Sequence, residues 1–154
     1  MTLQQVTLQT GLTEDTLRYY EKVGLLPHIA RDESSKQRRY SVENVYTAYK
    51  LAALRATGMS IGDMQHYIEN DLTTPELMSQ QVELLNNQKI IVKAKILRLE
   101  HQLEYLETKT AHYDAMSKGD EAEMYRLEVQ MIRLAKELNS ELKKLTEDKE
   151  KHAK

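Results

Sequence analysis

Apolar residues recur at helical spacing along most of the chain, and turn residues divide them into separate helices. Helices are predicted over 3–10 and 14–22, each opened by a threonine cap. Gly11 ends the first helix, and Pro27 fixes the chain after the second. Two helices joined by a short glycine-containing turn are typical of a helix-turn-helix. Its expected core consists of Val6, Leu12, Leu17 and Tyr20.

The next segment is polar, and it predicts a small hairpin followed by two more helices. Short strands are expected at 28–31 and 37–40, with the polar residues 32–36 as the loop between them. Serine caps then open helices over 42–57 and 61–70. The expected apolar face of the longer one consists of Val42, Val45, Tyr46, Tyr49, Ala52, Ala53 and Leu54.

A long heptad pattern begins at the helix start Thr74-Pro75. Its seam positions are Met78, Val82, Leu85, Lys89, Val92, Ile96, Leu99, Leu103, Leu106, Thr110 and Tyr113, of which all but Lys89 and Thr110 are apolar. A lone helix with this seam would expose a continuous apolar stripe, so the pattern predicts self-association as a coiled coil. We expect the dimer contacts at Leu85, Val92, Ile96, Leu99, Leu103 and Leu106.

A second apolar seam follows a helix break at 117–120. It consists of Met124, Leu127, Met131, Leu134, Leu138, Glu141 and Leu145. A short turn between two apolar-striped helices favours an antiparallel hairpin, in which the last helix packs on the long helix of its own chain or of the partner. The expected domains are thus 1–73, 74–116 and 117–154.

Composition excludes several kinds of protein. None of the 154 residues is cysteine, which removes disulfides, thiol catalysis and thiolate metal sites. No apolar run approaches the ~20 residues of a membrane span, so we expect a cytoplasmic protein that does not contact the membrane. No enzyme motif is present. His101 and His112 lie about 16 Å apart along one helix, too far to share a metal, and we expect no metal and no cofactor.

The stretch TLRYYEKVGLLP, residues 16–27, places an arginine and two tyrosines on the second short helix. Arginine suits phosphate or guanine, and tyrosine hydroxyls reach phosphate oxygens, so this helix is a candidate for DNA recognition. The net charge is only −2, so any DNA site must be a local patch of positive charge. The alternative leaves Tyr20 in the core and pairs Arg18 with Glu14 at helical spacing. The basic residues of the region are Arg18, Lys22, Arg31, Lys36, Arg38 and Arg39.

Three motifs in order resemble the MerR family of bacterial transcription regulators. They are TLRYYEKVGLLP, then Arg38-Arg39-Tyr40-Ser41, then LRATGMSIGDM at 54–64. The resemblance covers about residues 2–70. It implies a mainly helical fold: a winged helix-turn-helix with a β-hairpin wing, then a long coiled-coil dimerisation helix, here with an additional C-terminal helix. It also implies a homodimer that bends and untwists promoter DNA so that RNA polymerase can engage it.

The resemblance also assigns DNA-contacting residues. It implies that Arg18 and Tyr19 contact bases or backbone, with Thr16 near the bases, and that Arg38 and Tyr40 grip phosphate from the wing. Arg39 occupies a variable position, and Lys36 belongs to the same basic patch. The rival interpretation is a coiled-coil interaction or scaffold protein that does not bind DNA. The arginine, tyrosine and wing set argues against this rival, because a protein-docking face would not need it.

The resemblance leaves the effector open. Metal-sensing members carry cysteines at the ends of the long helix, and the aldehyde-responsive branch, which this chain resembles most, carries a thiol where this chain has Ala53. A thiol mechanism is therefore excluded. A small-molecule effector, if there is one, must bind noncovalently or act through another protein. The additional helix is expected to pack near His112, Tyr113 and Met116. It either only stabilises the dimer or forms an effector pocket between itself and the DNA-binding domain.

Overall fold

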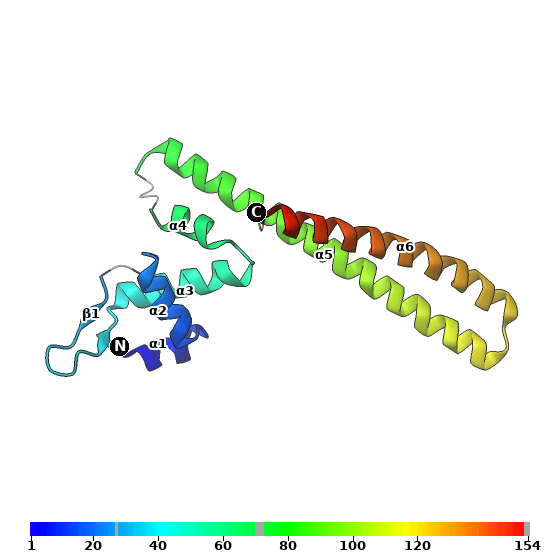
Figure 1. The fold of residues 1–154 in the computed structure, drawn as a ribbon, viewed down its shortest axis with the longest axis horizontal. Coiled ribbons are helices and arrows are strands. Elements are labelled where there is room, and N and C mark those ends of the chain that lie inside the picture. Colours follow the sequence, from blue (N-terminus) through cyan, green and yellow to red (C-terminus); the bar gives the residue numbers. More distant parts are fainter. Residues whose placement is uncertain (27, 70–72, 153–154) are drawn as a thin grey trace. The chain divides into compact units, whose positions relative to one another are not determined.

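The computed structural model describes residues 1–26, 28–69 and 73–152, with side chains described as far as residue 144. Pro27, Asn70 and the Leu145 side chain, which belonged to the expected elements, lie outside the described residues. The chain forms two compact units, Met1–Val92 and Lys93–Lys154, and each is described by itself. The long helix α5 (Pro75–Lys118) begins in the first unit and ends in the second (Figure 1).

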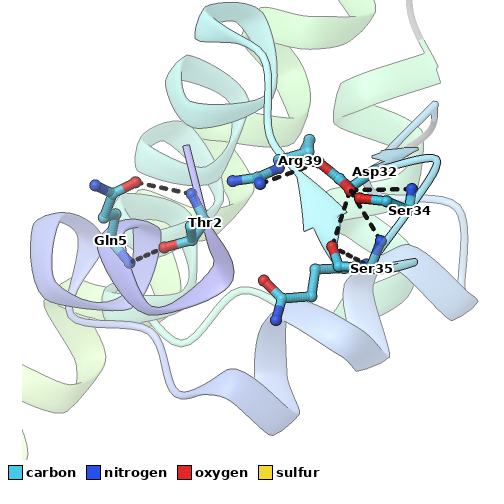
Figure 2. Close-up of polar contacts among 7 residues, drawn as sticks. Thr2, Gln5, Asp32, Ser34, Ser35 and Arg39 are labelled. Atoms are coloured by element: carbon cyan, nitrogen blue, oxygen red, sulfur yellow. Dashed lines mark hydrogen bonds and ion pairs between the residues drawn. The ribbon is translucent and has the colours of Figure 1, made fainter.

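The first unit opens with the predicted helix pair, α1 (Leu3–Thr10) and α2 (Glu14–Lys22). Thr2 caps α1 in a reciprocal capping box with Gln5 (Figure 2). Gly11 ends the helix in the left-handed conformation at φ 70°, which glycine adopts at little steric cost. The predicted ends of both helices are confirmed, because local caps set them.

The wing is shorter than predicted. It consists of β1 (Ala30–Arg31) and β2 (Arg38–Arg39), an antiparallel pair with Ala30 opposite Arg39. The polar segment carries no alternation of apolar and polar residues that would mark longer strands. Directly after β2, the backbone N–H of Tyr40 donates to the Met1 carbonyl at 2.8 Å.

Helices α3 (Val42–Ala56) and α4 (Ile61–Glu69) complete the core of the first unit. The predicted face of α3 is partly wrong: Val45 is buried, but Val42, Tyr46 and Tyr49 are exposed. The core side takes the small residue Ala48 instead, which lets α3 approach its neighbours closely. The buried cluster consists of Val6, Leu12, Leu17, Tyr20, Leu25, Leu26, Tyr40, Val45, Ala48, Leu51, Met59 and Met64.

Two glutamines join the start of α5 to the rest of the first unit. The Gln81 side chain donates to the Tyr67 carbonyl at 3.2 Å, and the Gln88 side chain donates to the Thr57 carbonyl at 2.9 Å. Both glutamines are buried. Each bond satisfies a backbone carbonyl near the end of α4 or α3, where helical partners run out.

The second unit is an antiparallel hairpin of α5 and α6 (Glu121–His152), as predicted (Figure 1). Gly119 makes the turn at φ 68°. Helix α6 turns its predicted seam toward α5: Leu127 is 4 % and Leu134 1 % exposed, and the other described seam residues are half-buried. On α5 the buried residues of this unit are Thr108 and Ala115, which do not belong to the heptad seam. The last helix therefore packs on a different face of α5 and leaves the seam open.

Candidate nucleic-acid interface

Helix α2 divides the arginine and tyrosines of its motif between two environments. Leu17 and Tyr20 are fully buried, whereas Arg18 and Tyr19 are exposed. The Tyr20 hydroxyl lies 3.4 Å from the Arg55 guanidinium. Tyr20 therefore packs, as the sequence suggested, and Arg18 and Tyr19 face solvent.

The first turn of α2 is fixed by its cap. The Thr13 hydroxyl accepts from the Thr16 backbone N–H at 3.2 Å, and the two hydroxyls lie 2.8 Å apart. Arg18 donates to Glu14 at 2.9 Å, the pairing that the alternative interpretation predicted. Both side chains are about half exposed. Such a pair contributes little to stability, so a phosphate can replace Glu14 at small cost.

Glu21 ties the wing to α2, and it was not among the site residues predicted from the sequence. Its carboxylate accepts from the Arg38 guanidinium at 2.5 Å and lies 3.6 Å from that of Arg31. Arg38 is thereby held against α2, with its side chain 24 % exposed. The sequence signal was an acid on α2 facing an arginine-rich wing, but the pairing across 17 positions cannot be inferred from spacing alone.

Asp32 organises the tip of the wing (Figure 2). One carboxylate oxygen accepts from the backbone N–H and hydroxyl of both Ser34 and Ser35, at 2.8–3.2 Å. The other accepts from Arg39 at 3.1 Å. The backbone N–H of Ser35 and the serine hydroxyls hold the pKa of Asp32 well below its usual range. The Arg39 side chain is therefore held by Asp32 at the tip of the wing.

We expect Asp32→Asn to loosen the wing and weaken DNA binding several-fold at neutral pH, because it removes the charge that gathers these donors. The Asp32 contacts stabilise the wing only while the carboxylate is ionised. This stabilisation is present above the ordinary aspartate pKa of about 3.9 and is lost as the pH falls below that value. Fluorescence anisotropy with a DNA duplex measures the effect. Glu33→Gln removes an equal charge from the same tip and is the control; equal changes in both variants would exclude a role for the Asp32 contacts.

Three of the expected contact residues line one hollow of about 380 Å³ between α1, α2 and the wing. They are Arg18, Lys36 and Arg38, and the lining also includes Thr2, Leu3, Gln4, Glu14 and Gln37. The hollow thus carries three cationic side chains against one carboxylate. A concave, mainly cationic surface beside an exposed recognition helix suits a phosphate group.

Tyr40 differs from the other expected contact residues, because it is buried. Only 3 % of it is exposed, and its hydroxyl has no hydrogen-bond partner among the described residues. Burial raises the pKa of this hydroxyl, and the nearby charge of Glu21 adds to the rise. In this structure Tyr40 is a core residue, so its expected grip on phosphate stays a prediction that requires the side chain to become accessible.

The seam on α5 presents the exposed stripe that the heptad pattern predicted. Leu99, Leu103 and Leu106 are 55–59 % exposed. Ile96 is about half exposed, Leu85 is 37 % exposed, and Val92 is intermediate. Large apolar side chains in such a row mark a protein interface. The stripe therefore fits the expected dimer contacts.

Neither a metal-binding cluster nor a membrane-spanning helix is found among the described residues. Among them, no three His, Cys, Asp or Glu side chains are placed to hold a metal ion. No helix in this part of the chain is long and apolar enough to cross a lipid bilayer.

A capped recognition helix, a short basic wing and a long helix define the class: a winged helix-turn-helix DNA-binding regulator. The model of the MerR HTH family regulatory protein matches residues 1–71. An uncharacterized HTH-type transcriptional regulator of Haemophilus influenzae is 35 % identical over 103 residues, which cover 67 % of this chain and 76 % of the relative. This chain therefore belongs to the MerR family, as its sequence motifs predicted.

Solved structures agree with this assignment. HiNmlR, a MerR family regulator lacking the sensor domain and bound to promoter DNA, matches with 32 % identity and a TM-score of 0.65, covering 77 % of this chain and 90 % of that one. A MerR family regulator from Bacillus thuringiensis matches with 27 % identity and a TM-score of 0.57, covering 72 % of this chain and 96 % of that one. The relatives are transcriptional regulators, and this chain is a transcriptional regulator of the same family.

Proposed function

We propose that this protein binds promoter DNA as a homodimer, with α2 at the base edges and the wing on the phosphate backbone. The observation that carries the proposal is the cationic hollow, in which Arg18 of α2 and Arg38 of the wing line one concave surface. The residues proposed to contact DNA are Thr16, Arg18, Tyr19, Lys36, Arg38 and Arg39, with Tyr40 as a further candidate.

The second part of the proposal concerns assembly. Two copies pair through the open seam of α5, and a two-fold dimer presents two recognition helices to one operator. Binding bends and untwists the duplex between the half-sites. RNA polymerase can then engage both promoter elements without touching the regulator. A promoter as target implies action in the cytoplasm.

The test is a mobility-shift assay on the DNA upstream of the protein's own gene, compared with an unrelated duplex over a range of salt concentrations. We expect specific retardation and an affinity that falls steeply with salt, because phosphate contacts release counterions. A scaffold protein would retard neither duplex at moderate salt. That result would support the rival function.

The effector, if one exists, binds without a covalent thiol step, because the chain contains no cysteine. The hairpin offers one place for it, a groove of about 490 Å³ between α5 and α6. Its lining includes His112, Tyr113 and Met116, the residues beside which the additional helix was expected to pack. Aromatic and methionine side chains in a groove of this size suit an apolar small molecule.

Truncation after Ser117 separates a sensor from a brace. If α6 only braces α5, truncation lowers the melting temperature and dimer affinity together, and DNA binding recovers at high protein concentration. If α6 forms a sensor, the truncated dimer binds operator but loses its response to inducer in a reporter assay. A truncated protein that folds, dimerises and responds normally would exclude both roles.

A further inference from the structure

A polar pair, His101 and Glu141, interrupts the apolar contact between α5 and α6. Every described seam residue of α6 before position 141 is apolar, and Glu141 then takes a seam position. Its carboxylate meets His101 of α5, with Nδ1 and Oε1 2.9 Å apart. The two side chains are 32 % and 30 % exposed, so the contact is partly shielded from water.

The second oxygen of Glu141 makes the pair sensitive to charge. Oε2 is buried and has no hydrogen-bond partner among the described residues. A half-buried carboxylate whose second oxygen is buried without a partner depends on its remaining contact, because an uncompensated charge is unfavourable beside apolar side chains. His101 supplies a compensating positive charge only when its ring carries two protons.

Other acids surround the same ring. The charges of Glu137 on α6 and Glu104 on α5 act on His101 together with that of Glu141. Arg133 lies 3.9 Å from Glu104 and offsets part of this negative charge. The hydrogen bond to Glu141 raises the pKa of His101 above its ordinary value, although partial burial opposes the rise.

We propose that His101 and Glu141 form a proton-controlled clasp, which holds α6 against α5 when the imidazole is protonated and loosens when it is neutral. The site thus responds to a proton that binds the His101 ring. A neutral ring can still donate one hydrogen bond, but it leaves three glutamates clustered without their histidine cation. The part of α6 around Glu141 then separates more readily from α5, so the stability of the hairpin depends on the protonation of His101.

The sign of the effect follows from the raised pKa. The stabilisation is fully present below the ordinary histidine pKa of about 6.5 and is lost as the pH rises through the higher pKa of the folded hairpin. The wild-type protein should therefore melt at a lower temperature at pH 8.5 than at pH 6. His101→Gln keeps a hydrogen-bond donor that cannot be charged, so it should lack this part of the pH dependence.

Two measurements on the full chain test the clasp. Thermal unfolding followed by circular dichroism at pH 6 and pH 8.5 compares wild type with His101→Gln, and His112→Gln is the control on the same helix. We expect the melting difference to shrink by a few degrees in His101→Gln only. The same difference in wild type and His101→Gln would overturn the proposal.

The second measurement does not depend on how the histidine variant folds. An NMR titration of the His101 ring in the wild-type protein should give a pKa above 6.5, and Glu141→Gln should return it toward that value. The amide oxygen of glutamine still accepts a hydrogen bond, so a purely structural contact would survive this change. A His101 ring that titrates at or below 6.5 in the wild type would contradict a proton-controlled clasp.

Discussion

Leu103→Asp is expected to convert the proposed dimer into a monomer that no longer binds operator DNA at ordinary concentrations. Leu103 lies in the middle of the α5 seam and is 55 % exposed in the single chain. Pairing of two seams buries it, so the variant places an unpaired carboxylate in the interface of each copy. Such a charge costs several kcal/mol, on the order of 3–5 when it lacks a partner.

The folded chain should tolerate this substitution, because α6 packs on a different face of α5. Ala111→Asp adds the same charge to an exposed, non-seam position of the helix and is the control. Sedimentation equilibrium should show monomer for Leu103→Asp and dimer for the control, with similar helical content by circular dichroism. A Leu103→Asp protein that remains dimeric would place the interface elsewhere on the molecule.

Arg38→Ala should weaken binding to every DNA sequence alike, by an order of magnitude or more. The variant removes a proposed phosphate contact, and the salt dependence should fall by roughly 0.9 in logarithmic slope, the share of one phosphate. It also cuts the bond to Glu21 that holds the wing against α2, so a less ordered wing adds to the loss. Anisotropy titrations on operator and unrelated duplexes over several salt concentrations measure both quantities.

Glu21→Gln distinguishes the two effects of losing Arg38. It weakens the same attachment of the wing but leaves the arginine free and removes a negative charge that DNA would meet. We expect Glu21→Gln to lower the melting temperature while keeping the salt slope. If Arg38→Ala changes neither slope nor affinity, Arg38 does not belong to the interface.

The sequence predicts best what local chemistry decides. The ends of α1 and α2 follow from threonine caps and Gly11, whose partners lie within a few residues. The seam of α6 follows from periodicity, because an apolar stripe must be buried whatever covers it. The outward position of Arg18 follows in the same way from the burial of Leu17 and Tyr20.

The sequence predicts poorly what distant contacts decide. Spacing cannot show that Glu21 pairs with Arg38 or that Tyr40 enters the core. Nor does it show which of its apolar faces α3 buries, because Tyr46 and Val45 look equally suited until their neighbours are known. The interruption of the α6 seam at Glu141 was visible, but its reason, His101, lies 40 positions away.

The glutamine contacts at the start of α5 limit where two regulators of this family can be recombined. Gln81 and Gln88 cover carbonyls of the first unit, so the opening turns of the long helix fold as part of the DNA-binding module. A chimera that takes its long helix from a relative should therefore be joined beyond Val92. Joined earlier, it needs glutamine at both positions, because other side chains would not donate the hydrogen bonds to the Tyr67 and Thr57 carbonyls. Recombination within the family should preserve this segment together with its own recognition helix.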